Sequence, residues 1–175
     1  MASNRHLGRI VALQTLYEYE FRQQLGDEDA SAVEIMERNL DRYDGVVGDT
    51  AFVAELVNGV TKTEAKLDEI LQPLAPEWPI KQIARIDRNI LRLGLFELVF
   101  MGSTVPPKVA INEAVELAKA FGSDSSSRFI NGVLGTAFAD LSKENQTDEA
   151  QEKPDESSAT GEDEDGSAEQ DEQES

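Results

Sequence analysis

The chain has 175 residues, a formal net charge of −19, no cysteine and one histidine. The missing cysteines exclude disulfides, thiolate zinc sites and thiol nucleophiles, and a single histidine cannot build a histidine metal site, so we expect no cofactor and no metal. General nucleic-acid binding needs a basic surface that neutralises phosphates. Any RNA site in this acidic chain must therefore be local.

Composition changes abruptly after Leu141 and predicts two regions. Residues 143–175 hold 14 acidic and two basic side chains and no large apolar ones. Such a segment cannot bury enough apolar surface to offset the entropy lost on ordering, so we expect a disordered acidic tail. Residues 1–142 are long enough to form one domain with a core.

No apolar run approaches the roughly 18 residues that a membrane span needs. The first residues, MASNRHLGR, also lack the apolar segment of a signal peptide. We therefore expect a soluble, cytoplasmic protein without a membrane partner.

Apolar residues recur with helical spacing, and no stretch long enough for a strand alternates between apolar and polar residues. We therefore predict an all-α fold. The predicted helices cover residues 4–24, 31–43, 49–73, 83–101, 107–121 and about 125–141. Their apolar positions, which we expect to face inward, include Tyr17, Phe21 and Val33. Gly59 predicts close packing or a bend, because glycine inside a helix costs about 1 kcal/mol relative to alanine.

The segment QPLAPEWP, residues 72–79, contains three prolines and cannot continue a helix. We therefore place a boundary there between two subdomains, residues 4–72 and 80–141. The helix that follows, IARIDRNILRLGLFELVFM at 83–101, has 12 apolar residues among 19 and is expected to be the central element.

Charged residues of the central helix raise two expectations. A polar strip of four cations, predicted to leave the interior, recurs at helical spacing: Lys81, Arg85, Arg88 and Arg92. Asp87 and Glu97 instead fall among apolar neighbours, where an ionised carboxylate is costly without a partner. Each is either an internal cap or ion pair, or a group that contacts another chain.

No catalytic constellation emerges from the sequence. Glycine-rich phosphate loops and the HExxH and GxSxG motifs are absent, and the only imidazole lies at the start of the first helix. We therefore predict that the protein is not an enzyme. The carboxylate pair Glu113 and Glu116 has helix-face spacing and is interpreted as a solvated face.

Arg5, His6 and Arg9 occupy the first turns of the first helix, where the macrodipole disfavours cations. Two arginines and unpaired backbone amides could bind phosphate oxygens there. A short basic N-terminus without such a role is the alternative.

Further along, three aromatic residues could stack on bases or serve as ordinary packing: Tyr17, Tyr19 and Phe129. Gly132 and Gly135 have a spacing that lets a neighbouring helix approach. Close internal packing is favoured over a ligand site at these glycines.

Three stretches together carry a resemblance to a known family. RHLGRIVALQTLYEYEF, IDRNILRLGLFEL, and VPPKVAINEAVELAKAFG followed by RFINGVL, in this order and spacing, resemble the NusB family of bacterial transcription antitermination factors. The resemblance spans nearly all of residues 4–141. It implies an all-α fold of about seven helices in two small orthogonal bundles and a role without catalysis.

The resemblance also implies partners. Members of the family pair with NusE, which is also a small-subunit ribosomal protein, and bind boxA RNA. The pair joins RNA polymerase and other Nus factors and suppresses termination, notably in ribosomal RNA operons. A helical adaptor with little RNA affinity of its own is the alternative function, and both a monomer and a homodimer are compatible with the sequence.

Carried over by position, the resemblance implies RNA contacts at Arg5, His6, Arg9, Tyr17, Ser125, Arg128 and Phe129. The arginine-rich N-terminal motif of the family falls on residues 5–9, which hold two arginines. The implied partner contacts are Asp87, Arg88 and Arg92. This would give the carboxylate of Asp87 a purpose.

Overall fold

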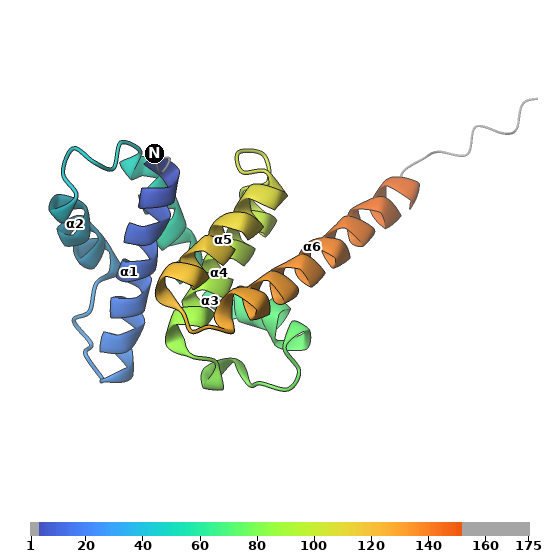
Figure 1. Ribbon diagram of the computed structural model, residues 1–175, viewed down its shortest axis with the longest axis horizontal. Helices are drawn as coiled ribbons and strands as arrows, with labels where there is room; N and C mark the ends of the chain where they lie inside the picture. The colour runs from blue at the N-terminus through green and yellow to red at the C-terminus, as the bar shows by residue number, and fades with distance from the viewer. Residues whose placement is uncertain (1–3, 152–175) are drawn as a thin grey trace, which may run out of the picture.

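The computed structural model describes the backbone of residues 4–151, with side chains through Lys143. It contains α1 (Asn4–Gln24), α2 (Ala32–Arg42), α3 (Thr50–Leu74), the 3-10 helix η1 (Ile80–Gln82), α4 (Arg85–Phe100), α5 (Pro107–Phe121) and α6 (Ser126–Gln151) (Figure 1). The described residues form no strand, which confirms the all-α prediction. The part of the expected acidic tail beyond Gln151 lies outside the described residues.

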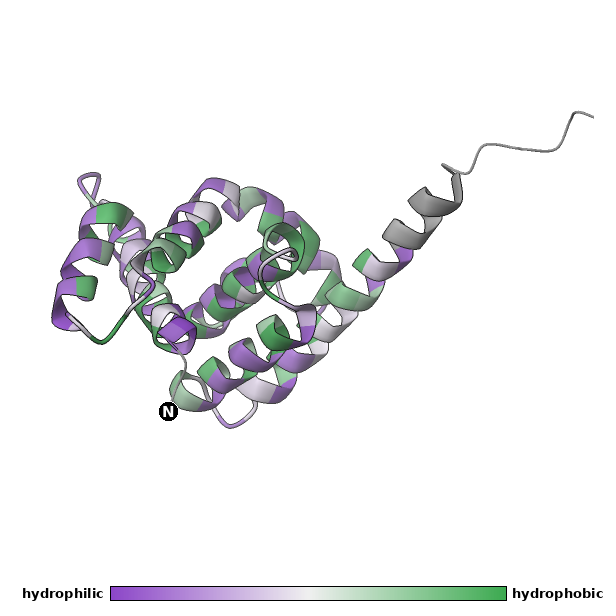
Figure 2. Ribbon diagram, turned by 90° about the horizontal axis from the view of Figure 1, so that it is seen from above, coloured by the Kyte–Doolittle hydropathy of each residue, from purple (hydrophilic) through white to green (hydrophobic). Residues whose placement is uncertain are grey.

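The helices pack in two groups that share one core. α1 lies against α2 and α3, α5 lies against α4 and α6, and α3 contacts α4 and so joins the groups (Figure 1). Hydrophilic and hydrophobic residues alternate around the helices, as expected for amphipathic helices that enclose a core (Figure 2). Over the described part of the chain, no helix has the length and apolarity to cross a membrane.

α4 is the central element, as predicted, because it contacts α1, α3, α5 and α6. Every residue from Asp87 to Glu97 is buried. The helix begins two positions later than expected, because Ile83 and Ala84 are extended after η1. The prediction that the cation strip leaves the interior is wrong for Arg88 and Arg92, which are each only 4% exposed, whereas Lys81 is exposed.

Capping side chains explain where α2 and α3 begin. The Ser31 hydroxyl accepts a hydrogen bond from the amide of Glu34, and the Asp49 carboxylate accepts one from the amide of Phe52, so each caps the helix that follows. α6 runs past Leu141, where we predicted its end, to Gln151. Six of the ten residues from 142 to 151 are Lys, Glu, Gln or Ala, which favour helix without needing a core.

Packing confirms one glycine prediction and overturns another. A Cβ atom on Gly59 would lie 2.0 Å from Cζ of Phe96, so α3 and α4 meet closely there. Gly132 and Gly135 have no atom within 4 Å of such a Cβ, so close internal packing is wrong for both. The inward prediction is also wrong for Tyr17, Phe21 and Val33, which are 39%, 44% and 43% exposed.

Candidate nucleic-acid and protein interface

The N-terminal cations do not share one environment. Arg9 is buried, and its Nε and Nη2 donate to the two carboxylate oxygens of Glu97 at 2.9 and 2.6 Å. Its guanidinium also lies 5.1 Å from the ring centre of Phe52. The preceding Gly8 permits this depth, because a Cβ atom there would lie 3.2 Å from Val53 of α3. In this structure Arg9 therefore joins α1 to α4.

Of the two alternatives for Glu97, the structure therefore shows the internal ion pair and not the contact with another chain. Its carboxylate is 2% exposed. Burial raises the pKa of Glu97, and the hydrogen bond and charge of Arg9 oppose that rise.

Arg5 and His6 lie nearer the surface. The Arg5 side chain is 42% exposed, pairs with Asp49 at 3.5 Å, and donates to the carbonyl of Thr104 at 3.3 Å. His6 Nδ1 lies 2.5 Å from Oε2 of Glu113. The expectation that Glu113 is a solvated group is wrong, because His6 and the buried Arg9 both lie against it.

Arg88 and Arg92 project toward α1 and α3 instead of solvent. Nε of Arg88 donates to Glu20 at 2.8 Å, and its Nη1 donates to the carbonyl of Ile83 at 2.6 Å. Arg92 makes two bonds of 2.8 Å to the carboxylate oxygens of Asp68. Acidic residues of α1 and α3 thus let two cations of the strip remain buried.

The same network shifts two pKa values. Burial by itself lowers the pKa of Arg92, but the hydrogen bond to Asp68 and the charges of Glu64, Asp68 and Glu20 outweigh it and raise the pKa. Burial raises the pKa of Glu64, and the charge of Arg92 opposes that rise. Arg88 and Arg92 connect α4 to α1 and α3 through ion pairs, and their contact with a partner stays a prediction.

Asp87 points to the other side of α4. Its Oδ2 accepts a hydrogen bond of 3.0 Å from the Ser126 hydroxyl at the start of α6. Its Oδ1 is buried and has no hydrogen-bond partner among the described residues. Among those residues, no cation lies within ion-pair distance of Asp87, so the structure shows no internal ion pair for it, and a contact with another chain stays a prediction.

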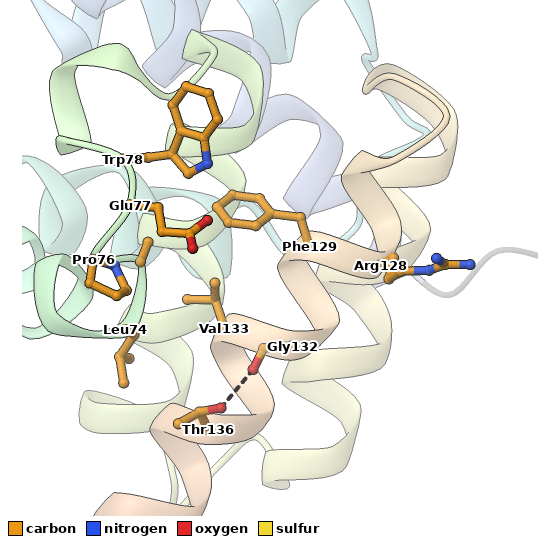
Figure 3. Close-up of a pocket in the computed structure, with 10 residues that line it drawn as sticks. Leu74, Pro76, Glu77, Trp78, Arg128, Phe129, Gly132, Val133 and Thr136 are labelled. Carbon is orange, nitrogen blue, oxygen red and sulfur yellow. Dashed lines mark hydrogen bonds between the residues drawn. The ribbon is translucent and has the colours of Figure 1, made fainter.

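Asp87 lines a cavity of about 320 Å³ with Ser125 and Phe129, two residues that the resemblance assigns to RNA. Trp78 and Phe129 line both this cavity and a second one of about 500 Å³, which Gly132 also borders. We call the two adjoining cavities the aromatic cleft. Figure 3 shows Trp78 and Phe129 side by side; Arg128 also borders the larger cavity, and the end of its side chain is directed outward.

Tyr17 lies outside the aromatic cleft. It lines a separate cavity of about 380 Å³ with Ile86 and Phe121. The guanidinium of Arg85 lies 5.3 Å from the ring centre of Tyr17 and 4.9 Å from that of Phe21. This exposed group of two rings and a cation has the chemistry of a base-stacking surface.

The structure therefore gathers Asp87, Ser125, Arg128 and Phe129 around the aromatic cleft but leaves the N-terminal cations and Tyr17 as separate sites. Sequence reasoning missed Trp78, although a lone tryptophan in a proline-rich segment was a usable signal. It also missed the partners of the buried arginines, Glu20 and Asp68, because nothing in a single sequence pairs residues of different helices. No group of three or more His, Cys, Asp or Glu able to hold a metal occurs in the described part.

Comparisons with known proteins agree with this architecture. The model of the NusB family matches residues 6–138. The transcription antitermination protein NusB of Chloroflexus aggregans is 41% identical over 150 residues, covering 85% of this chain and 96% of the relative. NusB of Dehalococcoides mccartyi strain 195 is 42% identical over 149 residues, covering 83% and 99%.

Solved structures show the same fold. NusB of T. maritima superposes with a TM-score of 0.70 at 26% identity, covering 85% of this chain and 99% of that one. A crystal structure of the antitermination factors NusB and NusE in complex with dsRNA gives a TM-score of 0.69 at 23% identity, covering 80% and 99%.

The chain is thus a small all-α protein whose first helix begins with cationic residues and carries exposed aromatic rings. It belongs to the NusB family, and its relatives are named for transcription antitermination.

Proposed function

We propose that this protein is a transcription antitermination factor that binds boxA-type RNA together with NusE and promotes transcription of ribosomal RNA operons. Contacts with RNA polymerase and other Nus factors are then indirect. In this role it acts in the cytoplasm by binding and without catalysis. Family membership supports the proposal, as does the solved complex of related NusB and NusE proteins with dsRNA.

The observation that carries the RNA part is the exposure of Tyr17 on the same helix as Arg5. Tyr17 is 39% exposed and stands beside Arg85, and the Arg5 side chain is 42% exposed. An exposed aromatic ring beside a cation such as Arg85 can stack on a base, and Arg5, at the start of the same helix, can attract a phosphate at a separate point. Because Arg9 is buried and paired with Glu97, we expect Arg5 to supply most of the attraction of the N-terminal motif for RNA phosphates.

The internal pairing of the cations favours the second candidate, an adaptor with little RNA affinity of its own. Arg9, Arg88 and Arg92 all bind carboxylates within the chain. An adaptor would still bind NusE, and RNA affinity would reside in the partner.

Fluorescence anisotropy of a labelled boxA-like RNA separates the two candidates. The RNA is titrated with the protein alone and with its cognate NusE at one salt concentration. Arg5→Ala is compared with Arg42→Ala, which removes an exposed cation of α2. Antitermination by direct contact predicts that Arg5→Ala weakens binding of the complex about threefold to tenfold while Arg42→Ala does not. If Arg5→Ala and Arg42→Ala change the RNA affinity of the complex equally, and both variants still bind NusE, the protein is an adaptor with little RNA affinity of its own.

A further inference from the structure

We propose that the acidic segment 152–175 docks on its own chain, over a cationic patch formed by Lys62 and Lys66 of α3 together with Phe100 of α4. We call these three residues the lysine patch. The contact keeps other polyanions, random RNA among them, away from the two lysines. It goes beyond the proposed function and depends on neither boxA RNA nor NusE.

The two lysines of the patch have no acidic partner. Lys62 and Lys66 are exposed, and no carboxylate among the described residues lies within ion-pair distance of either. Even Glu69, three positions after Lys66, makes no such pair. The buried arginines of α1 and α4, by contrast, all bind carboxylates. Because positions 62 and 66 are four apart, both ammonium groups lie on one side of α3 and are available to an anion.

Phe100 orients Lys66 at the surface. The Nζ atom of Lys66 lies 5.3 Å from the ring centre of Phe100, which is 42% exposed. The ring of Phe100 in turn lies 5.2 Å, centre to centre, from that of Phe96, which is buried. An aromatic face attracts an ammonium group without neutralising its charge. Lys66 therefore keeps its full charge for another partner.

α6 brings the acidic segment to the lysine patch. Leu141 of α6 lines a cavity of about 300 Å³ with Ile70 of α3. Lys66 lies four residues before Ile70, and Lys62 four residues before Lys66, the spacing that places residues on one side of a helix. The patch therefore begins one turn from the contact between α3 and α6, and α6 then continues beyond the other helices (Figure 1).

Length and charge favour the acidic segment as the occupant of the patch. Gln151, where α6 ends, lies ten residues or about 15 Å beyond Leu141 along the helix. The next 24 residues hold 11 acidic side chains and one basic side chain. A coil of that length spans about 27 Å on average, which is enough to return to α3. Covalent attachment gives the segment an effective concentration on the order of millimolar at the patch, so a weak attraction suffices.

Paramagnetic NMR tests the contact directly. The chain has no cysteine, so a nitroxide on Ser167→Cys is a single label within the acidic segment. We expect this label to broaden the amide signals of Lys62 and Lys66 in preference to that of Arg42, an exposed cation of α2. The double variant Lys62→Gln/Lys66→Gln should lose the broadening along α3, and Arg42→Gln should keep it. Salt at 1 M, with a screening length of about 3 Å, should also remove it.

Two results of this experiment overturn the proposal. One is broadening that is absent or spread evenly over the helices, and the other is selective broadening that persists in the lysine double variant. A mixture of ¹⁵N protein without the nitroxide and ¹⁴N protein with it tests for contact between two copies. Broadening of the ¹⁵N chain would overturn docking within one chain. No step uses RNA or NusE, so failure here is distinct from failure of the proposed function.

The exclusion of other polyanions is measured with a random-sequence RNA at low salt. A full-length variant whose 11 acidic residues in 152–175 are replaced by Asn and Gln should bind this RNA at least about tenfold more tightly than the unmodified protein. Part of this gain comes from the lower net negative charge and is the same in every background. The part due to docking should disappear with Lys62→Gln/Lys66→Gln, which lowers the gain at least about threefold, but not with Arg42→Gln. An equal gain in all three backgrounds would overturn the proposal.

Discussion

Arg9 and Glu97 lie 88 positions apart in the sequence and form an ion pair with three hydrogen bonds, in which both side chains are almost completely buried. The pair joins α1, which carries the arginine motif that the resemblance assigns to RNA, to α4 at the centre of the fold. Arg9, which the resemblance assigns to RNA, therefore also holds the fold together. A loss of RNA binding in an Arg9 variant has to be separated from a loss of stability.

We expect Arg9→Ala to destabilise the protein by about 3 to 5 kcal/mol, because it leaves the Glu97 carboxylate buried without a cation. Arg5→Ala should cost less than about 1 kcal/mol, since the Arg5 side chain is 42% exposed and its ion pair is screened by solvent. Urea denaturation of both variants checks the contrast. Equal losses of stability would contradict the assignment of Arg9 to the core.

The raised pKa of Glu97 predicts a pH dependence of stability. Because the folded state binds this proton more tightly than the unfolded state, the contribution of Glu97 to stability is greatest below its ordinary pKa of about 4.5 and falls as pH rises through the higher folded value. Relative to Glu97→Gln, the unmodified protein should therefore gain stability as pH falls from 7. Urea denaturation of both proteins across this range measures the difference, and a gap that is independent of pH would refute the shift.

Arg92 predicts that charge alone does not preserve the network between α3 and α4. Arg92→Lys retains the positive charge but cannot make both bonds to Asp68, so we expect a loss of about 1 to 3 kcal/mol. Arg22→Lys serves as the control, because the Arg22 side chain is 36% exposed and pairs with Asp27 near the surface. It should change stability by less than about 0.5 kcal/mol. Chemical denaturation of the two variants provides the comparison.

Gly59 and Gly135 predict opposite effects of the same substitution. Gly59→Ala places a Cβ atom against the ring of Phe96 and should destabilise the protein by about 1 to 3 kcal/mol, despite the better helix propensity of alanine. Gly135→Ala meets no neighbour and should stabilise α6 by up to about 1 kcal/mol. Thermal denaturation distinguishes the two, and a stabilised Gly59 variant would show that α3 and α4 can separate there.

The sequence by itself determined the helical class, the helix bounds near capping residues and prolines, and the central place of α4. These features depend on local spacing, on capping residues and on apolar content, all of which are visible in a single sequence. The sequence also indicated that the carboxylates of Asp87 and Glu97 needed partners.

Only the tertiary structure decided which side chains pair with the charged residues of α4. Helical spacing shows that Arg88 and Arg92 share a side of α4, but not that Glu20 and Asp68 from other helices cover that side. The same limit hid the aromatic cleft, because Trp78 precedes α4 whereas Phe129 belongs to α6. Charge pairing and cavity formation depend on which helix faces meet, and that follows from packing of the whole chain rather than from any one segment.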